Sequence, residues 1–218
     1  MKKLYIFDLD GTLLDTIHTI ADSANSALEH FGLPTLETEK YKYFVNKGSK
    51  NLILLALNAI GCNTEENFNK VFPLFTELYK KNTFLKPTHF PDMPKTLAKL
   101  KEKGIRLAVV SNKPHSLLEP LVPLYFGDDL FDYVLGGREN IPLKPDPYAV
   151  NEVLSLCGIS PKDAVFVGDT GIDMQAGKAA GVFSIGVLWG FREEKELLEN
   201  GADVLISNTT ELLNYIEA

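Results

Sequence analysis

Aspartates stand close together in two short segments of this chain. Asp8 and Asp10 are two residues apart and precede a glycine and a threonine, and Asp169 and Asp173 are four residues apart after a glycine. Two carboxylates at the end of a strand can both face one crevice. Such a group suits nucleophilic attack, general acid–base catalysis or the binding of a hard cation such as Mg²⁺. By itself, each segment also fits a plain surface turn or an acidic helix start.

Two further segments carry side chains that could bind an anion. Ser111 and Asn112 offer a hydroxyl and an amide after a stretch of apolar residues, and Lys144 lies in a loop before a Pro-Asp-Pro sequence. A lone Ser-Asn pair is more often a helix cap, and most lone lysines are solvated. The order of all four segments along the chain is therefore more informative than any one of them.

The segments that must position these side chains are short and apolar at every position. This pattern is typical of strands buried on both faces of a parallel sheet. Such strands are expected at residues 4–7, 107–110, 164–167, 183–187 and 204–206. Helix-like stretches lie between them, and two of these end at Gly104 and Gly158, where a helix C-cap favours glycine. The alternation predicts an α/β fold with a doubly wound, mostly parallel sheet of Rossmann-like type and all four polar segments at one edge.

One long stretch interrupts this alternation. Helical spacing of apolar residues predicts consecutive helices at residues 17–31, 38–45, 50–60 and 64–82. We therefore expect two domains, an α/β catalytic core from residues 1–15 and 88–218 and a small helical cap from residues 16–87. A helical block inserted directly after the first strand suits a cap over the edge of the sheet where α/β proteins bind ligands.

Composition narrows the classes of partner. The 218 residues include 22 basic and 29 acidic side chains, which give a formal charge of -7. This charge disfavours nucleic acid and anionic membranes as partners, because both need a basic surface. No apolar segment is long enough to span a membrane, and the first acidic residue comes too early for a signal peptide. Cys62 and Cys157 lack a CxxC spacing, so we expect reduced thiols and a cytoplasmic location.

Taken in order, the four polar segments resemble the signature of the haloacid dehalogenase superfamily, which is DxDGT, then Ser or Thr, then Lys, then GDxxxD. The resemblance covers essentially the whole chain. It implies that Asp8 is the nucleophile that attacks phosphorus and becomes an aspartyl phosphate. It also implies that Asp10 is the general acid that protonates the leaving oxygen and then the base for the hydrolytic water.

The same resemblance implies a magnesium ion and a phosphate site. Mg²⁺ would be held by Asp8, the backbone carbonyl of Asp10, Asp169 and, through water or at second remove, Asp173. The phosphoryl oxygens would be bound by Thr12, Ser111, Asn112 and Lys144. One divalent cation and one lysine would then bring an anionic substrate to a site that four aspartates would otherwise repel.

Two details favour a phosphatase among the reactions of this superfamily. The dehalogenase branch replaces the second aspartate of the first motif, and Asp10 is present here. The sugar-phosphate mutase branch usually has Glu-Asp in the fourth motif, where this chain has Gly168-Asp169. A mutase, a pyrophosphatase and a catalytically silent phosphate-binding protein stay open as alternatives. The presence of both Asp8 and Asp10 argues against the silent protein, which needs neither a nucleophile nor an acid.

A finer resemblance is to the phosphoglycolate phosphatase-like group. It rests on segments 90–97, 188–191 and 201–203 and on Asp15-Thr16. It implies that the substrate is a small phosphorylated metabolite, with 2-phosphoglycolate as the first choice. The oligomeric state stays open between a monomer and a homodimer.

The chain departs from that group at two turns. Asn46-Lys47-Gly48 stands where Gly-Xaa-Gly is usual in the cap, and Asp92 stands where Gly is usual. Asn and Asp tolerate the left-handed backbone, so both turns are expected to keep their shape. Lys47 could pair with a carboxylate on the leaving group, and His18, just beyond the catalytic loop, is a second candidate contact for the substrate.

Overall fold

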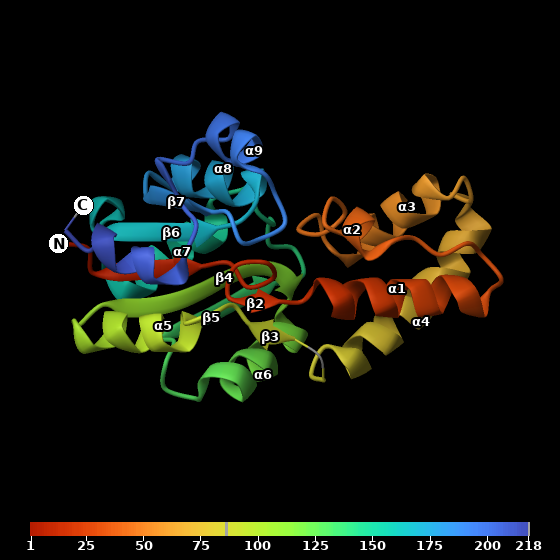
Figure 1. Cartoon of the computed structure of the whole chain (residues 1–218), viewed down its shortest axis with the longest axis horizontal. Helices are drawn as coiled ribbons and strands as arrows, with labels where there is room; N and C mark the ends of the chain where they lie inside the picture. Colours follow the sequence, from red (N-terminus) through yellow and green to blue (C-terminus); the bar gives the residue numbers. More distant parts are fainter. Residues whose placement is uncertain (86, 218) are drawn as a thin grey trace. The chain divides into compact units, whose positions relative to one another are not determined.

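The computed structural model describes residues 1–85 and 87–217 of the chain (Figure 1). By its internal contacts the chain divides into two compact units. The first unit consists of Met1–Asp15 and His89–Ala218, and the second consists of Thr16–Thr88. A large sheet organises the first unit, whereas the second unit is helical.

Among the described residues, the sheet of the first unit has six strands in the order β5-β4-β1-β6-β7-β8. They are β1 (Leu4–Phe7), β4 (Arg106–Pro114), β5 (Tyr133–Gly137), β6 (Ala164–Gly168), β7 (Phe183–Val187) and β8 (Val204–Ile206). Across the part of the chain that the structure describes, all neighbouring strands of this sheet run parallel to each other. The predicted α/β fold with a mostly parallel sheet is therefore confirmed.

The other elements of this unit are mainly helices. They are α5 (Met93–Glu102), α6 (His115–Phe126), α7 (Tyr148–Cys157), η1 (Pro161–Asp163), α8 (Gly171–Ala180), α9 (Glu194–Glu199) and η2 (Thr209–Tyr215). A separate two-stranded sheet consists of β2 (Leu14–Asp15) and β3 (Thr88–His89). The predicted C-cap glycines are confirmed, because Gly104 follows α5 and Gly158 follows α7, both with positive φ.

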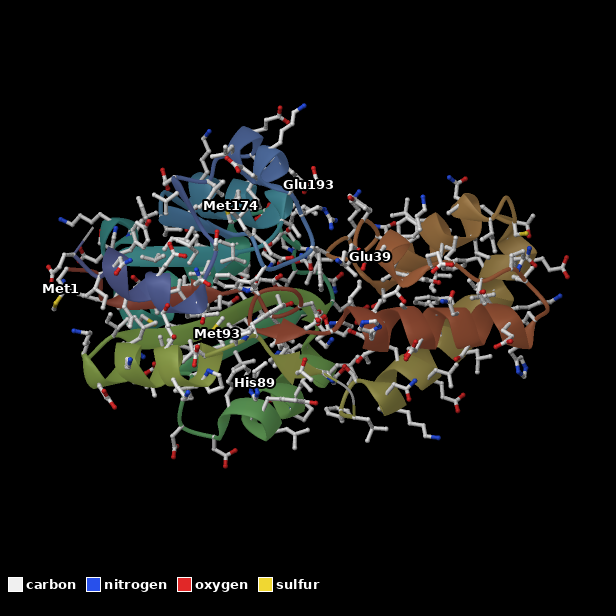
Figure 2. The ribbon with its side chains drawn as sticks, viewed as in Figure 1. Met1, Glu39, His89, Met93, Met174 and Glu193 are labelled. Carbon is white, nitrogen blue, oxygen red and sulfur yellow. The ribbon has the colours of Figure 1, made fainter. Side chains whose placement is uncertain are left out.

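Helices cover both faces of the large sheet. Leu4 and Ile6 of β1 belong to a buried cluster that includes residues of α7 and α8. The alternate residue Tyr5 faces the other way, and its hydroxyl donates to the carbonyl of Leu212 in η2 at 3.1 Å. Met93 of α5 and Met174 of α8 are both fully buried (Figure 2). With both faces covered, continuous apolar strands are the pattern that such a sheet requires.

The strand β5 and the helix α6 are among the elements of this unit that the sequence did not predict. β5 is an edge strand, and Tyr133, Val134 and Leu135 are only half-buried. Three apolar residues followed by two glycines form a pattern too short to separate from a loop. The helix α6 contains Pro120 and Pro123, a residue type that normally disfavours a helix interior.

The second unit contains α1 (Ile17–His30), α2 (Thr38–Tyr41), α3 (Ser49–Ala59) and α4 (Glu65–Asn82). α1 and α4 pack together, and Ala24 and Phe75 are among their buried side chains. The predicted helix 38–45 is too long, because the chain continues in turns after Tyr41 and reaches Asn46 with φ 67°. Within residues 1–85 and 87–217, no helix is long and apolar enough to cross a membrane.

Candidate active site

The central position of β1 gathers the predicted site residues. β1 pairs with β4 on one side and with β6 on the other, so that Phe7 lies opposite both Val109 and Val167. The backbone N–H of Asp8 donates to the carbonyl of Val167 at 2.9 Å. Because parallel strands end at the same edge, the residues that follow β1, β4 and β6 meet there.

Three aspartates form a buried acidic triad at this edge. Asp8, Asp169 and Asp173 each offer a carboxylate oxygen, and these oxygens lie within 4.8 Å of one another. The carboxylate of Asp169 accepts hydrogen bonds from the Thr12 hydroxyl and from the backbone N–H of Phe191, both at 2.9 Å. Asp169 is therefore held by two hydrogen-bond donors, one of which is the predicted site residue Thr12.

Asp173 is held by the start of the helix that it begins. In a capping box at the N-terminus of α8, its Oδ2 accepts from the backbone N–H of Thr170 at 3.1 Å and from the Thr170 hydroxyl at 2.6 Å. Its Oδ1 is thereby left facing Lys144. Asp173 of the fourth motif therefore caps α8, and the same hydrogen bonds orient its carboxylate.

Lys144 connects two members of the triad. Its ammonium lies 2.9 Å from Asp8 Oδ1 and 2.7 Å from Asp173 Oδ1, and it donates to the carbonyl of Val110 at 2.9 Å. The Asn112 amide bonds to both backbone groups of Lys144, at 2.9 Å to the carbonyl and 2.8 Å from the N–H. Asn112, expected to contact phosphate, is thus placed to position Lys144.

A second lysine, absent from the predicted site, contacts the second aspartate of the first motif. Lys113 Nζ lies 3.1 Å from Asp10 Oδ1 and 3.5 Å from Asp10 Oδ2. The two side chains are only 1% and 8% exposed, so this ion pair is buried. The Ser111 hydroxyl accepts from the backbone N–H of Lys113 at 3.3 Å. The signal in the sequence was a lysine directly after Ser111 and Asn112 at a strand end, beside residues already assigned to an anion.

Burial and crowding change the acidity of the triad. Burial raises the pKa of Asp8 to about 6, with Lys144 opposing the rise and Asp173 and Asp10 adding to it. Burial and the neighbouring Asp173 and Asp8 also raise the pKa of Asp169 well above its usual value. Burial by itself would lower the pKa of Lys144. The carboxylates of Asp173 and Asp8 outweigh this effect, so the pKa of Lys144 is raised. The carboxylates therefore resist carrying their full charge together in this site.

The charges at this edge do not cancel. Four buried aspartates, at positions 8, 10, 169 and 173, meet two buried lysines, at positions 113 and 144. The other buried charged side chains among the described residues bond elsewhere, Lys2 to a backbone carbonyl and Arg192 to Glu196. One divalent cation would supply the missing two positive charges, and carboxylate oxygens suit a hard cation. The residues present therefore fit a magnesium ion.

Two glycines allow the backbone to approach Asp169. Gly11 has φ 87°, and a Cβ built there would overlap the Asp169 carboxylate. A Cβ at Gly190 would overlap the Asp169 side chain and the carbonyl of Gly11. The Asp-Gly sequence of the first motif is thus required by close packing as well as by the turn.

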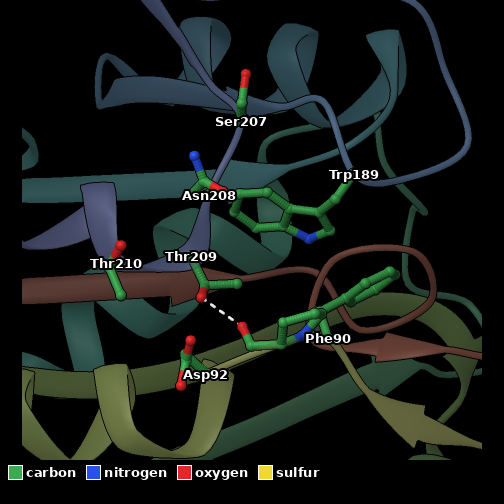
Figure 3. Close-up of a pocket in the computed structure, with 8 residues that line it drawn as sticks. Phe90, Asp92, Trp189, Ser207, Asn208, Thr209 and Thr210 are labelled. Carbon is green, nitrogen blue, oxygen red and sulfur yellow. Dashed lines mark hydrogen bonds between the residues drawn. The ribbon is translucent and has the colours of Figure 1, made fainter.

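A small pocket of about 170 Å³ lies beside Trp189 (Figure 3). Its lining includes Phe90, Asp92 and Asn208, and the Thr209 hydroxyl at its wall donates to the carbonyl of Pro91 at 2.6 Å. The Trp189 indole N–H donates to the carbonyl of Thr12 at 3.1 Å. Trp189 therefore supports the loop after β1 from the side of this pocket.

The predicted specificity residues belong to the second unit. Lys47 and His18 are both exposed, and the carbonyl of Lys47 accepts from the Asn51 side chain at 2.8 Å. At the two departing turns, Asn46 has φ 67° and Asp92 has φ 56°. Both residues thus adopt the left-handed backbone that glycine would supply.

Comparison with known proteins agrees with this geometry. The family model described as haloacid dehalogenase-like hydrolase matches residues 5–187. Phosphoglycolate phosphatase 1 of Pseudomonas aeruginosa is 33% identical over 98% of this chain and 79% of its own length. Phosphoglycolate phosphatase of Haemophilus influenzae is 33% identical over 98% of both chains.

A solved structure shows the same fold along the whole chain. The crystal structure of a predicted phosphoglycolate phosphatase from Haemophilus somnus superposes with a TM-score of 0.89 at 29% identity. It covers 98% of this chain and 97% of that chain. The motif order, the parallel sheet with its inserted helices and the sequence matches all agree, and the chain belongs to the haloacid dehalogenase-like hydrolase family.

Proposed function

We propose that this chain is a magnesium-dependent phosphatase that transfers a phosphoryl group from a small metabolite to Asp8 and then to water. The observation that carries the proposal is the uncancelled charge around Asp8, where four buried carboxylates meet two ammonium groups. A buried excess of negative charge is costly unless a cation joins it. An enzyme that must attract a phosphate dianion has a use for such a cation.

Asp8 is the nucleophile in this proposal. One carboxylate oxygen attacks phosphorus, and the ester bond to the leaving oxygen breaks. Lys144 Nζ, 2.9 Å from Asp8 Oδ1, restrains the carboxylate and lies where it can bind a phosphoryl oxygen. Asp10 donates a proton to the leaving oxygen, and as a carboxylate it later takes a proton from the water that attacks the aspartyl phosphate. Phosphate then leaves and Asp8 is restored.

We assign Mg²⁺ to the carboxylates of Asp8 and Asp169, the backbone carbonyl of Asp10, and Asp173 in support. When bound, the ion offsets the negative charge of the phosphoryl oxygens as the ester bond breaks. We assign the phosphoryl oxygens to Thr12, Ser111, Asn112 and Lys144, with Asn112 acting through the backbone of Lys144.

For the substrate we propose 2-phosphoglycolate. The names of the relatives that are 33% identical over 98% of this chain support it. We also propose Lys47 and His18 as specificity residues, because an exposed ammonium in the second unit could bind a leaving-group carboxylate. Lys47→Ala should then lower kcat/KM for 2-phosphoglycolate by about one to two decades, the worth of one charged hydrogen bond.

The test is phosphate release from a panel of substrates with Mg²⁺ or with chelator. The panel holds 2-phosphoglycolate, pyrophosphate, a hexose phosphate and an aryl phosphate. We expect Mg²⁺-dependent release, greatest for 2-phosphoglycolate, and its loss in Asp8→Asn. Full activity in chelator would contradict the magnesium assignment, and near wild-type release from Asp8→Asn would contradict the nucleophile. A preference for pyrophosphate or hexose phosphate would overturn the substrate alone.

A further inference from the structure

Lys113 is the buried ammonium group to which the proposed reaction gives no role. It is the residue before the last in β4, and the backbone register with β5 shifts between Val110 and Pro114. Its backbone N–H donates to the Ser111 hydroxyl at 3.3 Å, and its side chain is only 1% exposed. A lysine this far from solvent is expected to be paired with a carboxylate.

The partner of Lys113 is the side chain on which the proton transfers depend. Its ammonium lies within 3.5 Å of both carboxylate oxygens of Asp10. The backbone at Asp10 is already restrained, since Asp10 bridges to Leu14 and the N–H of Gly11 donates to the Leu14 carbonyl at 2.9 Å. The side-chain torsions of Asp10 are the freedom that is left, and the contact of the Lys113 ammonium with both carboxylate oxygens restrains them.

The two buried lysines serve different carboxylates. Lys144 lies against Asp8 and Asp173, whereas Lys113 lies against Asp10. Resting on the proposed function, we propose that Lys113 is a positioning residue that holds the Asp10 carboxyl group in the place from which it exchanges protons. On this view Lys113 acts on turnover only through Asp10, while Lys144 acts on the nucleophile.

A double-mutant cycle tests this coupling. The four proteins are the wild type, Lys113→Met, Asp10→Asn and the double variant, and each is assayed with Mg²⁺ on the panel substrate that the wild type hydrolyses fastest. Asp10 as acid and base is worth about 10²–10⁴ in rate, so misplacing it in Lys113→Met should lower kcat by about 10–100-fold, with KM within about threefold. In the Asp10→Asn background, the same change should cost less than about threefold.

Two kinetic results would overturn the proposal. An equal loss in both backgrounds would mean that Lys113 acts independently of Asp10. A raised KM with unchanged kcat would mean that Lys113 binds the substrate. Lys101→Met is the matched control, because Lys101 also pairs with an aspartate, Asp132, at 3.1 Å. Asp132 accepts from the backbone N–H of Leu107 near the start of β4, at the opposite end of that strand from Lys113. That variant should keep the wild-type kcat.

Folding and function need separate readouts. Lys113→Met leaves a buried carboxylate beside an apolar side chain, so its thermal unfolding is compared with that of the double variant, which removes both charges. Lys113→Arg keeps the charge and should recover part of the lost kcat. A crystal structure of Lys113→Met gives a readout without turnover, and we expect the Asp10 carboxylate to be displaced or split between conformers. An Asp10 side chain in its original place would overturn the proposal, whereas failure of the proposed function would be seen in the wild type as no Mg²⁺-dependent phosphate release.

Discussion

At the scale of single residues, the site is organised by which lysine holds which aspartate. Lys144 lies between Asp8 and Asp173, and Lys113 holds Asp10. Each lysine is in turn positioned through backbone groups, by Asn112 for Lys144 and by Ser111 for Lys113. A neutral side chain can therefore be essential to this site by placing a charged one.

We expect Asn112→Ala to impair both stability and turnover. The change leaves the buried backbone N–H and C=O of Lys144 without their side-chain partner, and an unsatisfied buried group costs about 1–3 kcal/mol. Urea unfolding of the variant measures this loss, and phosphate release measures the effect on Lys144. Asn151→Ala is the matched control, since Asn151 is exposed on α7 and should change stability by less than about 0.5 kcal/mol. Unchanged stability in Asn112→Ala would favour direct phosphate binding by Asn112 instead.

At the scale of elements, β4 serves both ends of the sheet. At its carboxyl end it carries Lys113, which pairs with Asp10, and Val110, whose carbonyl accepts a hydrogen bond from the Lys144 ammonium. Near its start, the backbone N–H of Leu107 donates to Asp132 Oδ2 at 3.0 Å. The same carboxylate lies 3.1 Å from Lys101 Nζ and 3.2 Å from Arg106 Nε. Asp132 thus ties the start of β4 to the segment that leads into β5.

The acidity of Asp132 predicts how stability depends on pH. Burial by itself would raise the pKa of Asp132, but the hydrogen bonds from Leu107, Lys101 and Arg106 outweigh it and lower the pKa below its usual value. A lowered pKa in the folded state means that the ionised group stabilises the fold above the unfolded pKa of about 3.9, and that this contribution is lost as the pH falls below that value. We therefore expect wild type to exceed Asp132→Asn in urea midpoint from about pH 5 to 7, with the gap narrowing toward pH 3. A gap that stays constant down to pH 3 would contradict this account.

At the scale of the whole molecule, the site described above lies in one compact unit, and a second, helical unit is inserted after β2. The acidic triad, both lysines and their supporting backbone all belong to the first unit. The residues proposed to bind the metal and the phosphoryl group therefore all belong to that unit. The residues proposed above to discriminate among substrates, Lys47 and His18, belong to the second unit.

If the acidic triad binds Mg²⁺, the ion should stabilise the folded protein without any substrate. A ligand at 100 times its Kd that binds only the folded state adds about 2.7 kcal/mol, which for a chain of this size raises Tm by roughly 5–10 °C. Thermal unfolding in MgCl₂, with KCl at equal ionic strength as the control, measures the shift. Asp169→Asn should abolish most of it, because it removes one charged ligand from the triad. An equal shift in Asp169→Asn would place the ion elsewhere.

Local sequence was sufficient for much of this protein. Strands buried on both faces are apolar at every position, so β1, β4, β6, β7 and β8 could be predicted, and glycines marked the ends of α5 and α7. Because parallel strands end at one edge, the order of the motifs also predicted that Asp8, Ser111, Lys144 and Asp169 would meet. The sequence did not predict the half-exposed edge strand β5 or the proline-containing helix α6. Both depend on the elements that pack against them rather than on a local sequence pattern.

The pairing of side chains within the site was decided only by the tertiary structure. Lys113 and Asp10 are 103 residues apart, and Asn112 and Lys144 are 32 residues apart. No local sequence pattern can therefore predict either contact. The motif resemblance placed Lys144 among the aspartates, but nothing in the sequence indicated that Lys113 would be buried against Asp10. Lys113 lies within the register shift at the end of β4, whereas the backbone of Lys144 is held by Asn112, and leaving either charge buried alone would be costly.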